Sequence, residues 1–347
     1  MEKPQKFIDI RDDLSKEIND KANDLYKQIR AVDVDRLDMD SFCRNYFKEC
    51  HSGRLIFSLR CSAHIIYDSL KSQDKPINEI VFVDYGAGLG TLFMLAAKLP
   101  FKKVLYNDHL EEWCRSAFVI CKSLGINILH FIKGDIDELV GYCKADNIFP
   151  DIIASRNVIE HIYDLEYFFK TINNAFPNCI VYSTTTANYQ NPAMHLRHIM
   201  IHRNMEKKYF LTQREELAKT RIIGIGKDLM AKAVKLSRGK AMADFDLAMA
   251  EFQKTGTITP PPFLHSNTCD SATGVWAEHL LSKSEYEKII MPSGFSMKYK
   301  AGFWDVNYPN PLLNVFAKVM NGLIAISGDN GVLWSPFVCI VARQKIK

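Results

Sequence analysis

The feature that most constrains the fold is an alternation of two kinds of segment between residues 79 and 186. Short apolar segments, each typical of a buried strand, alternate with longer segments whose apolar residues recur at helical spacing. The expected strands are 79–85, 102–108, 127–135, 151–157 and 179–186, and the expected helices are 90–99, 111–125, 136–146 and 164–176. Strands separated by helices predict a parallel sheet with helices on both faces. Ligands of such sheets bind at the carboxyl ends of the strands.

The alternation ends near residue 186, and the rest of the chain predicts further units. The polar segment 72–79 contains a proline and indicates a boundary after a helical beginning. Strands are expected again at 295–305 and 334–345, after a helix at 282–294. The predicted units are a helical N-terminal cap (1–75), a cofactor-binding core (76–186), a basic helical insertion or lid (187–282) and a segment that completes the sheet (283–347).

Composition narrows the class of protein. No run of 18 apolar residues is present, so no membrane span is expected, and the charged N-terminus has no signal-peptide pattern. Nine scattered cysteines without a CxxC pair indicate free thiols in a reducing, cytoplasmic compartment. Between Arg197 and Lys240, twelve Lys and Arg residues face four Asp and Glu residues. This excess indicates either a solvated helical face or a surface that meets something acidic.

A glycine-rich turn follows the first expected strand, in the stretch VDYGAGLGT. Asp84 ends the strand, and Gly86, Gly88 and Gly90 follow. Glycine allows the backbone to adopt positive φ and to approach a ligand closely. No Lys follows these glycines, which excludes a P-loop. Thr91 stands where a dinucleotide fingerprint would have its third glycine, which weakens a hydride-transfer interpretation.

The ends of the next strands carry polar residues that suit a nucleoside. Asp108 ends the second strand, where a carboxylate can accept hydrogen bonds from both ribose hydroxyls. Asp135 follows the third strand and could bond an adenine amino group. The fourth strand leads into Asn157, Glu160 and His161, which we expect at the rim of the same crevice.

Together, the glycine turn, Asp108, the Gly134–Asp135 pair and the segment NVIEH resemble class I S-adenosylmethionine-dependent methyltransferases, over residues 79–184 and more loosely in the last strands. Segment 268–283 also resembles small-molecule methyltransferases of bacterial sugar and lipid biosynthesis. The resemblance implies a doubly wound, Rossmann-like, mostly parallel seven-stranded sheet with an antiparallel last strand, and S-adenosylmethionine as cofactor. The cofactor-binding residues expected on this basis are Asp84, Gly86, Ala87, Gly88, Gly90, Asn107, Asp108, Asp135, Ile136 and Asn157.

Methyl transfer to a hydroxyl needs alignment of the acceptor and a base for its proton. His161 is the candidate base, because a histidine titrates near neutrality. Glu160 could orient His161 or contact the acceptor. The alternative is that this pair caps the next helix or packs against the sheet.

Further histidines offer weaker candidates. His195, His198 and His202 share one helix face, which allows a metal site, a contact with an acidic acceptor, or plain surface. No carboxylate is evident nearby, so we expect no metal. The pair Glu278–His279, expected on a late helix, and His265 could reach the acceptor pocket.

The leading hypothesis is a methyltransferase acting on an oxygen of a small-molecule, sugar-linked or lipid-linked acceptor, which the basic insertion would suit if the acceptor is anionic. An RNA methyltransferase is a second hypothesis, although the insertion lacks interleaved aromatic residues and no RNA-binding module is present. A third is a protein that binds S-adenosylmethionine without catalysis, and a fourth is a dehydrogenase. The oligomeric state stays open.

Overall fold

A seven-stranded sheet forms the centre of the computed structural model, which describes residues 5–128 and 130–345. Its strands are β1 (Val81–Tyr85), β2 (Lys103–Asp108), β3 (His130–Lys133), β4 (Ile152–Arg156), β5 (Ile180–Thr185), β6 (Phe295–Ala301) and β7 (Val338–Gln344). They lie in the order β3-β2-β1-β4-β5-β7-β6, and β7 is antiparallel to both of its neighbours. The predicted fold class, with an antiparallel last strand, is confirmed.

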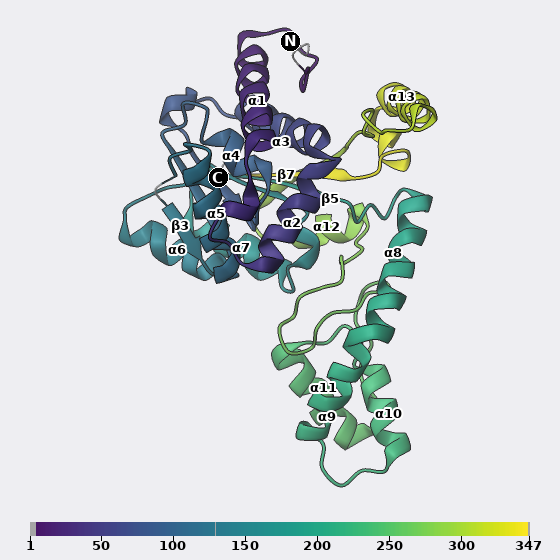
Figure 1. The fold of residues 1–347 in the computed structure, drawn as a ribbon. Helices are drawn as coiled ribbons and strands as arrows, with labels where there is room; N and C mark the ends of the chain where they lie inside the picture. Colours follow the sequence, from purple (N-terminus) through teal and green to yellow (C-terminus); the bar gives the residue numbers. More distant parts are fainter. Residues whose placement is uncertain (1–4, 129, 346–347) are drawn as a thin grey trace.

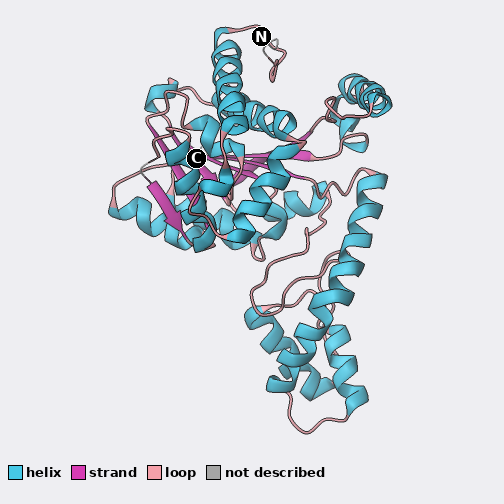
Figure 2. Cartoon of the chain, in the orientation of Figure 1, coloured by secondary structure: helices cyan, strands magenta, loops and turns pink. Residues whose placement is uncertain are grey.

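Helices cover both faces of the sheet (Figures 1 and 2). Along β1, Phe82 points into one hydrophobic core, whereas Val81 and Val83 point into the other. Both faces are thus buried, which explains why this strand reads as a continuous apolar run. The helices that pack on the sheet between its strands are α4 (Thr91–Ala96), α5 (Glu111–Ser123), α6 (Ile136–Ala145), α7 (Leu165–Ala175) and α12 (Lys283–Ile290).

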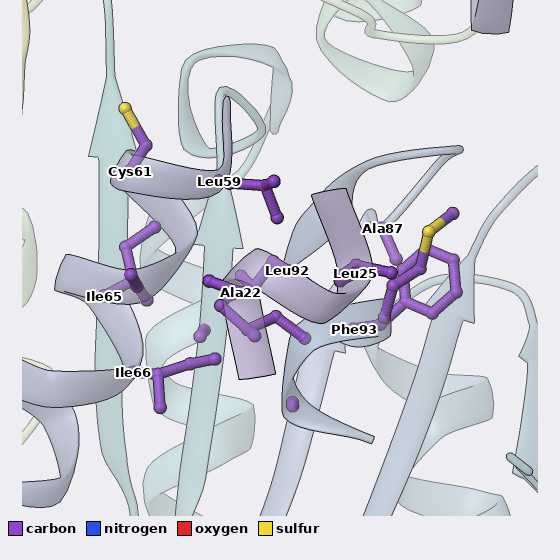
Figure 3. Close-up of a cluster of buried hydrophobic side chains, with 14 of the residues drawn as sticks. Ala22, Leu25, Leu59, Cys61, Ile65, Ile66, Ala87, Leu92 and Phe93 are labelled. Carbon is purple, nitrogen blue, oxygen red and sulfur yellow. The ribbon is translucent and has the colours of Figure 1, made fainter. Parts of the chain in front are cut away.

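The N-terminal helices share a core with the sheet. They are α1 (Asp13–Ala31), α2 (Ser41–Ser52) and α3 (Leu55–Leu70), with a short 3-10 helix at Val34–Arg36. Figure 3 shows Leu25 of α1, Leu59 and Ile66 of α3, and Phe93 of α4 in one buried cluster. This segment is helical, as expected, and it is continuous with the body of the protein through that cluster.

The insertion between β5 and β6 is helical, as predicted, and it extends away from the sheet (Figure 1). Phe245, Met249 and Phe252 form a core of its own with Val234. Its helices are α8 (Pro192–Met205), a π-helical turn (Glu206–Phe210), α9 (Leu211–Arg221), α10 (Lys227–Leu236) and α11 (Met242–Thr255). The domain boundaries expected at residues 75, 186 and 282 stay predictions.

Two segments differ from the expectations or add to them. Residues 264–281 run back toward the sheet without regular helix, so the expectation of a helix at Glu278–His279 is wrong; Glu278 has a positive φ of 56°. We call residues 264–281 the strap. Between β6 and β7 lie α13 (Pro311–Ile326), which the sequence pattern did not predict, and a 3-10 helix (Gly328–Leu333). In the part of the chain that the structure describes, no helix is both long and apolar enough to cross a membrane.

Candidate active site

The glycine loop lies between β1 and α4, at the carboxyl edge of the sheet. Gly86 and Gly88 have positive φ values of 65° and 49°, which glycine adopts without strain. A Cβ atom on Gly86 would lie 2.7 Å from the Val158 methyl groups. The Ala87 amide donates to the Asn107 carbonyl at 2.9 Å, and the Gly90 amide donates to the Ala87 carbonyl at 3.0 Å. The loop is therefore packed tightly against the end of β2 and the segment that follows β4.

Replacing Gly86 by alanine is expected to destabilise the protein by about 1–3 kcal/mol, because the new methyl group meets Val158 and φ is positive. Chemical denaturation measures this change. Adding Val158→Ala should recover the part due to the clash. The matched control is Gly141→Ala, whose Cβ meets nothing within 4 Å and whose helical position favours alanine. A Gly86→Ala variant as stable as the Gly141→Ala variant would contradict this account of the loop.

Asp84 lies beneath the glycine loop and supports it. Its side chain is only 2% exposed, and Oδ2 accepts a hydrogen bond from the Phe93 amide at 2.8 Å, in the first turn of α4. Burial raises the pKa of this carboxyl to about 8. Asp84 thus joins the end of β1 to the start of α4 from below, and the expectation that it contacts the cofactor stays a prediction.

Asp108 lies directly against the glycine loop. Its Oδ2 atom accepts a hydrogen bond from the Gly88 amide at 2.9 Å, and Oδ1 accepts one from the Leu110 amide at 3.1 Å. Each carboxylate oxygen can accept a further bond. Asp108 also raises the pKa of His109, whose Nδ1 lies 3.4 Å from Oδ1. The structure therefore brings together the two parts of the expected nucleoside site, which lie twenty residues apart in the sequence.

The β3–α6 turn completes this edge. The fully buried Asn107 amide donates to the carbonyls of Ile132 and Gly134, at 3.2 and 2.9 Å, so Asn107 holds the turn in place. The Gly134 amide donates to the Asp108 carbonyl at 2.9 Å. Asp135 is exposed at the start of α6, and its amide donates to Glu138 Oε2. Ile136 is 5% exposed and packs in the core, so of the predicted adenine contacts Asp135 is the accessible one.

An aromatic cluster from α2 and α5 borders the glycine loop. Trp113 meets Tyr46 and Phe42 edge to face, with ring centroids 4.7 and 5.6 Å apart. A Cβ on Gly88 would lie 3.9 Å from Trp113. His51 is tied to the same loop, since its Nε2 donates to the Leu89 carbonyl at 3.1 Å, and burial lowers its pKa to about 4. Sequence reasoning missed these residues, because α2 carries no motif.

Arg156, at the end of β4, was also missed. Its Nη1 donates to the Ser58 carbonyl and hydroxyl, at 3.1 and 2.8 Å. Its positive charge lowers the pKa of both Asp84 and His51, opposing the effect of burial on the first and adding to it on the second. The sequence could have indicated Arg156 as a site residue, because it precedes Asn157 at the end of a predicted strand. Arg156 thus joins the end of β4 to α3.

The rim after β4 carries the two candidate catalytic groups. Glu160 is 1% exposed, and the Thr185 side chain and the Glu160 backbone amide are the hydrogen-bond donors next to its carboxyl. Burial raises its pKa to about 7. His161 Nδ1 lies 2.7 Å from the Trp276 carbonyl, to which it must donate. The neutral ring then has its lone pair on Nε2, the form that a general base requires. Asn157 is exposed nearby, with a positive φ of 57°.

The strap docks onto this rim. The His279 amide donates to the Glu160 carbonyl at 2.7 Å, and the Trp276 amide donates to the His161 carbonyl at 3.4 Å. The Trp276 ring stacks between His279 and Tyr163, with centroids 3.9 and 5.5 Å away. Buried polar atoms without a hydrogen-bond partner among the described residues lie on the strap and on α12: Trp276 Nε1, His279 Nδ1 and Nε2, and Tyr286 Oη. Such atoms are expected to bind water or a polar ligand.

The histidines of α8 face the strap. His198 Nε2 lies 2.6 Å from Glu278 Oε2, and its Nδ1 donates to the Met194 carbonyl. This contact lowers the pKa of Glu278. His202 Nε2 donates to the Glu278 carbonyl at 3.0 Å. The expectation that no carboxylate lies near these histidines is wrong, because Glu278 comes from a distant segment. In residues 5–128 and 130–345, no group of three or more His, Cys, Asp or Glu side chains could hold a metal ion.

Three histidines, the buried His202 and His279 and the half-buried His51, make the protein sensitive to acid. Burial lowers the pKa of His51 and His202 to about 4 and that of His279 to about 3, from an ordinary 6.5. Below pH 6.5 the unfolded chain therefore binds protons that the folded protein excludes, so stability is lost as pH falls through this window. Each histidine is expected to cost about 2 kcal/mol between pH 7.5 and pH 5. Urea denaturation at both values should show this loss reduced by about 2 kcal/mol in His279→Phe. An unchanged loss would contradict the assignment.

Comparisons with known proteins add a likeness of fold. No family model matches the chain, and no curated protein matches its sequence. Among solved structures, it is similar to an S-adenosylmethionine-dependent methyltransferase from Clostridium acetobutylicum, at 12% identity and a TM-score of 0.45, over 88% of this chain and 100% of that one. It is also similar to the plantazolicin methyltransferase BpumL, solved with S-adenosylhomocysteine, at 12% identity and a TM-score of 0.40, over 96% of this chain and 99% of that one. A methyltransferase from Mesorhizobium loti aligns at 15% identity and a TM-score of 0.38, over 81% of this chain and 98% of that one. What the site can bind follows from this chain's own residues.

Proposed function

We propose that the carboxyl edge of the sheet binds an adenosyl cofactor, and that the protein is an S-adenosylmethionine-dependent methyltransferase. The observation that carries the proposal is the 2.9 Å bond between the Gly88 amide and the Asp108 carboxylate. This bond places the glycine loop, whose backbone a ligand can approach closely, beside a carboxylate suited to ribose hydroxyls. Both lie at the edge of the sheet where ligands of such folds bind.

The residues present fit this cofactor. Gly88 leaves room for close approach, since a Cβ there would meet only Trp113, at 3.9 Å, whereas Gly86 lets the loop pack against Val158. Asp108 keeps acceptor capacity for ribose hydroxyls, and the exposed Asp135 is available to an adenine amino group. When bound, S-adenosylmethionine supplies an electrophilic methyl group on a positively charged sulfur.

His161 is proposed as the base that removes the acceptor's proton. Its Nδ1 is engaged by the Trp276 carbonyl, which orients the ring and leaves Nε2 as the acceptor atom. Val158 packs against the glycine loop. Its carbonyl accepts a hydrogen bond from the His161 amide at 2.8 Å, so a single turn, Val158–His161, connects the His161 ring to that loop. The acceptor would be positioned by this turn so that its nucleophilic atom is in line with the methyl group.

Glu160 is proposed to hold or move a proton beside His161. Its carboxyl is buried, and burial raises its pKa to about 7 against the lowering effect of His161 and of hydrogen bonds from its own backbone and Thr185, so both protonation states are accessible near neutrality. Orphaned polar atoms on Trp276, His279 and Tyr286 favour a polar acceptor, in keeping with transfer to an oxygen of a small-molecule, sugar-linked or lipid-linked compound. The RNA methyltransferase and the non-catalytic binding protein remain as alternatives that the experiment separates.

The test is transfer of labelled methyl from S-adenosylmethionine into a cell extract, separated afterwards into nucleic acid, protein, lipid and glycan fractions. We expect label in the lipid, glycan or small-molecule fraction, released by treatments that cleave methyl ethers or esters. Label confined to RNA would favour the alternative enzyme. Binding of the cofactor without transfer to any fraction would favour a protein without catalysis.

A further inference from the structure

Helix α13 exposes most of its apolar residues to solvent, while Met320, Leu323 and Ile324 are half-buried. With a turn of 100° per residue, nine apolar residues from Leu312 to Ile326 cover about half of its circumference. The exposed fractions reach 76% for Leu312, 60% for Val315, 58% for Val319 and 82% for Ile326. Single exposed apolar side chains are ordinary, but a contiguous face of this width marks an interaction site.

The opposite side of α13 attaches the helix to the protein. Asn314 exchanges hydrogen bonds with the backbone of Tyr308, and Asn321 does the same with Trp304, at 2.7–3.0 Å. Ala317, on this side, is fully buried. The helix is thus held by its polar side, and it projects beyond the sheet (Figure 1). Most of its apolar side chains are exposed. A surface helix ordinarily turns its apolar side toward the protein core and its polar side toward solvent, and α13 has the opposite orientation.

From this inverted orientation we propose that α13 docks onto a lipid membrane surface that contains anionic lipids. The width of the apolar face favours a membrane over a second copy of the chain. A pair of helices buries a stripe of about 100° on each, whereas an interfacial helix sinks its whole apolar half about 5–10 Å into the lipid. Phe316 of this face is 49% exposed, and Trp334, just after the 3-10 helix that follows α13, is 41% exposed; exposed aromatic residues suit a lipid interface.

The charges around this face complement an anionic surface. The apolar half carries no charge, and the polar side contributes the exposed Lys318. Exposed Lys298 lies on β6, the strand that leads toward α13. Against these two lysines, the 3-10 helix that follows α13 carries the exposed Asp329. Basic residues near an apolar anchor strengthen attraction to anionic lipids by about 1 kcal/mol each.

The position of α13 determines which edge of the sheet would face a bound membrane. Strand β6 is antiparallel to β7, which is antiparallel to β5, so β6 ends at the same edge as β1 and β4. The chain then continues into α13. A membrane bound at α13 would therefore lie toward the edge that carries the glycine loop and His161. The docking itself does not depend on the proposed methyl transfer, and it is measured without cofactor.

The test is sedimentation of the full-length protein with vesicles of phosphatidylcholine alone and of phosphatidylcholine mixed with phosphatidylglycerol. We expect binding to the mixed vesicles that weakens with added salt, and weaker binding to the neutral ones. The triple variant Leu312→Gln, Val319→Gln, Ile326→Gln is expected to bind at least about tenfold more weakly, because three buried side chains are lost. The matched control, Leu229→Gln with Leu247→Gln, changes exposed leucines of α10 and α11 and should bind as the unmodified protein does.

Three results would overturn the proposal. They are unmodified protein that stays in the supernatant with both vesicles, a triple variant that sediments like the unmodified protein, and a dimer that the triple variant converts to a monomer in light scattering. The last result would assign the face to a second copy. Circular dichroism checks that each variant is folded, and the single change Ile326→Gln, at the most exposed of these positions, should give a smaller fall in binding if the triple variant is unstable.

Discussion

Replacing Asp108 by alanine is expected to weaken binding of S-adenosylmethionine about 100-fold, measured by titration calorimetry. The change removes a carboxylate that would accept hydrogen bonds from ribose hydroxyls. It also removes the acceptor that holds the Gly88 amide at 2.9 Å, so the glycine loop loses its contact with β2.

Two further variants separate these effects. Asp108→Asn keeps a side-chain oxygen for the Gly88 amide but removes the charge, and its affinity should lie between those of the unmodified protein and Asp108→Ala. Asp137→Ala changes an exposed carboxylate of α6 that accepts from the Tyr167 hydroxyl, away from the glycine loop. It should bind the cofactor as the unmodified protein does. Equal affinities for Asp108→Ala and Asp137→Ala would remove Asp108 from the cofactor site.

The second large effect is expected at His161. Replacing it by alanine should lower the rate of methyl transfer to a hydroxyl acceptor about 100-fold or more, while the affinity for the cofactor stays nearly the same. The reason is that Nε2, the one ring nitrogen without an engaged proton, is the atom proposed to accept the acceptor's proton.

Loss of His161 also removes a hydrogen bond that holds the strap, so a second variant is needed. The amide of asparagine can donate to the Trp276 carbonyl in place of Nδ1 but offers no base at the position of Nε2. His161→Asn should therefore keep the stability of the unmodified protein and share the low rate of His161→Ala. Turnover at the unmodified rate in His161→Asn would exclude the proposed base.

Much of the fold was predictable because its signals are local. The strands at the centre of the sheet are buried on both faces, so they appear as apolar runs, and the helices between them carry helical spacing. Parallel strands place their carboxyl ends on one edge, which is why Gly88 and Asp108 could be expected to meet. Asp84 shows the limit of that reasoning, because a residue at a strand end can point beneath the loop and bond the Phe93 amide.

The residues that were missed depend on contacts between distant segments. Glu278 contacts His198, 80 positions away in the sequence, and no local sequence pattern near either residue predicts this pair. The aromatic residues of α2 reach the glycine loop only because that helix packs against α5. The outward apolar face of α13 was equally hidden, because an apolar half-helix is ordinarily read as a buried one.

The central claim, that this edge of the sheet holds an adenosyl cofactor of methyl transfer, is tested most directly by calorimetry of the full chain with three ligands. S-adenosylmethionine and S-adenosylhomocysteine are predicted to bind with a Kd of roughly 1–100 μM, at one site each, and NAD is predicted to give no heat of binding. Binding of NAD with no signal from either adenosyl compound would contradict the account.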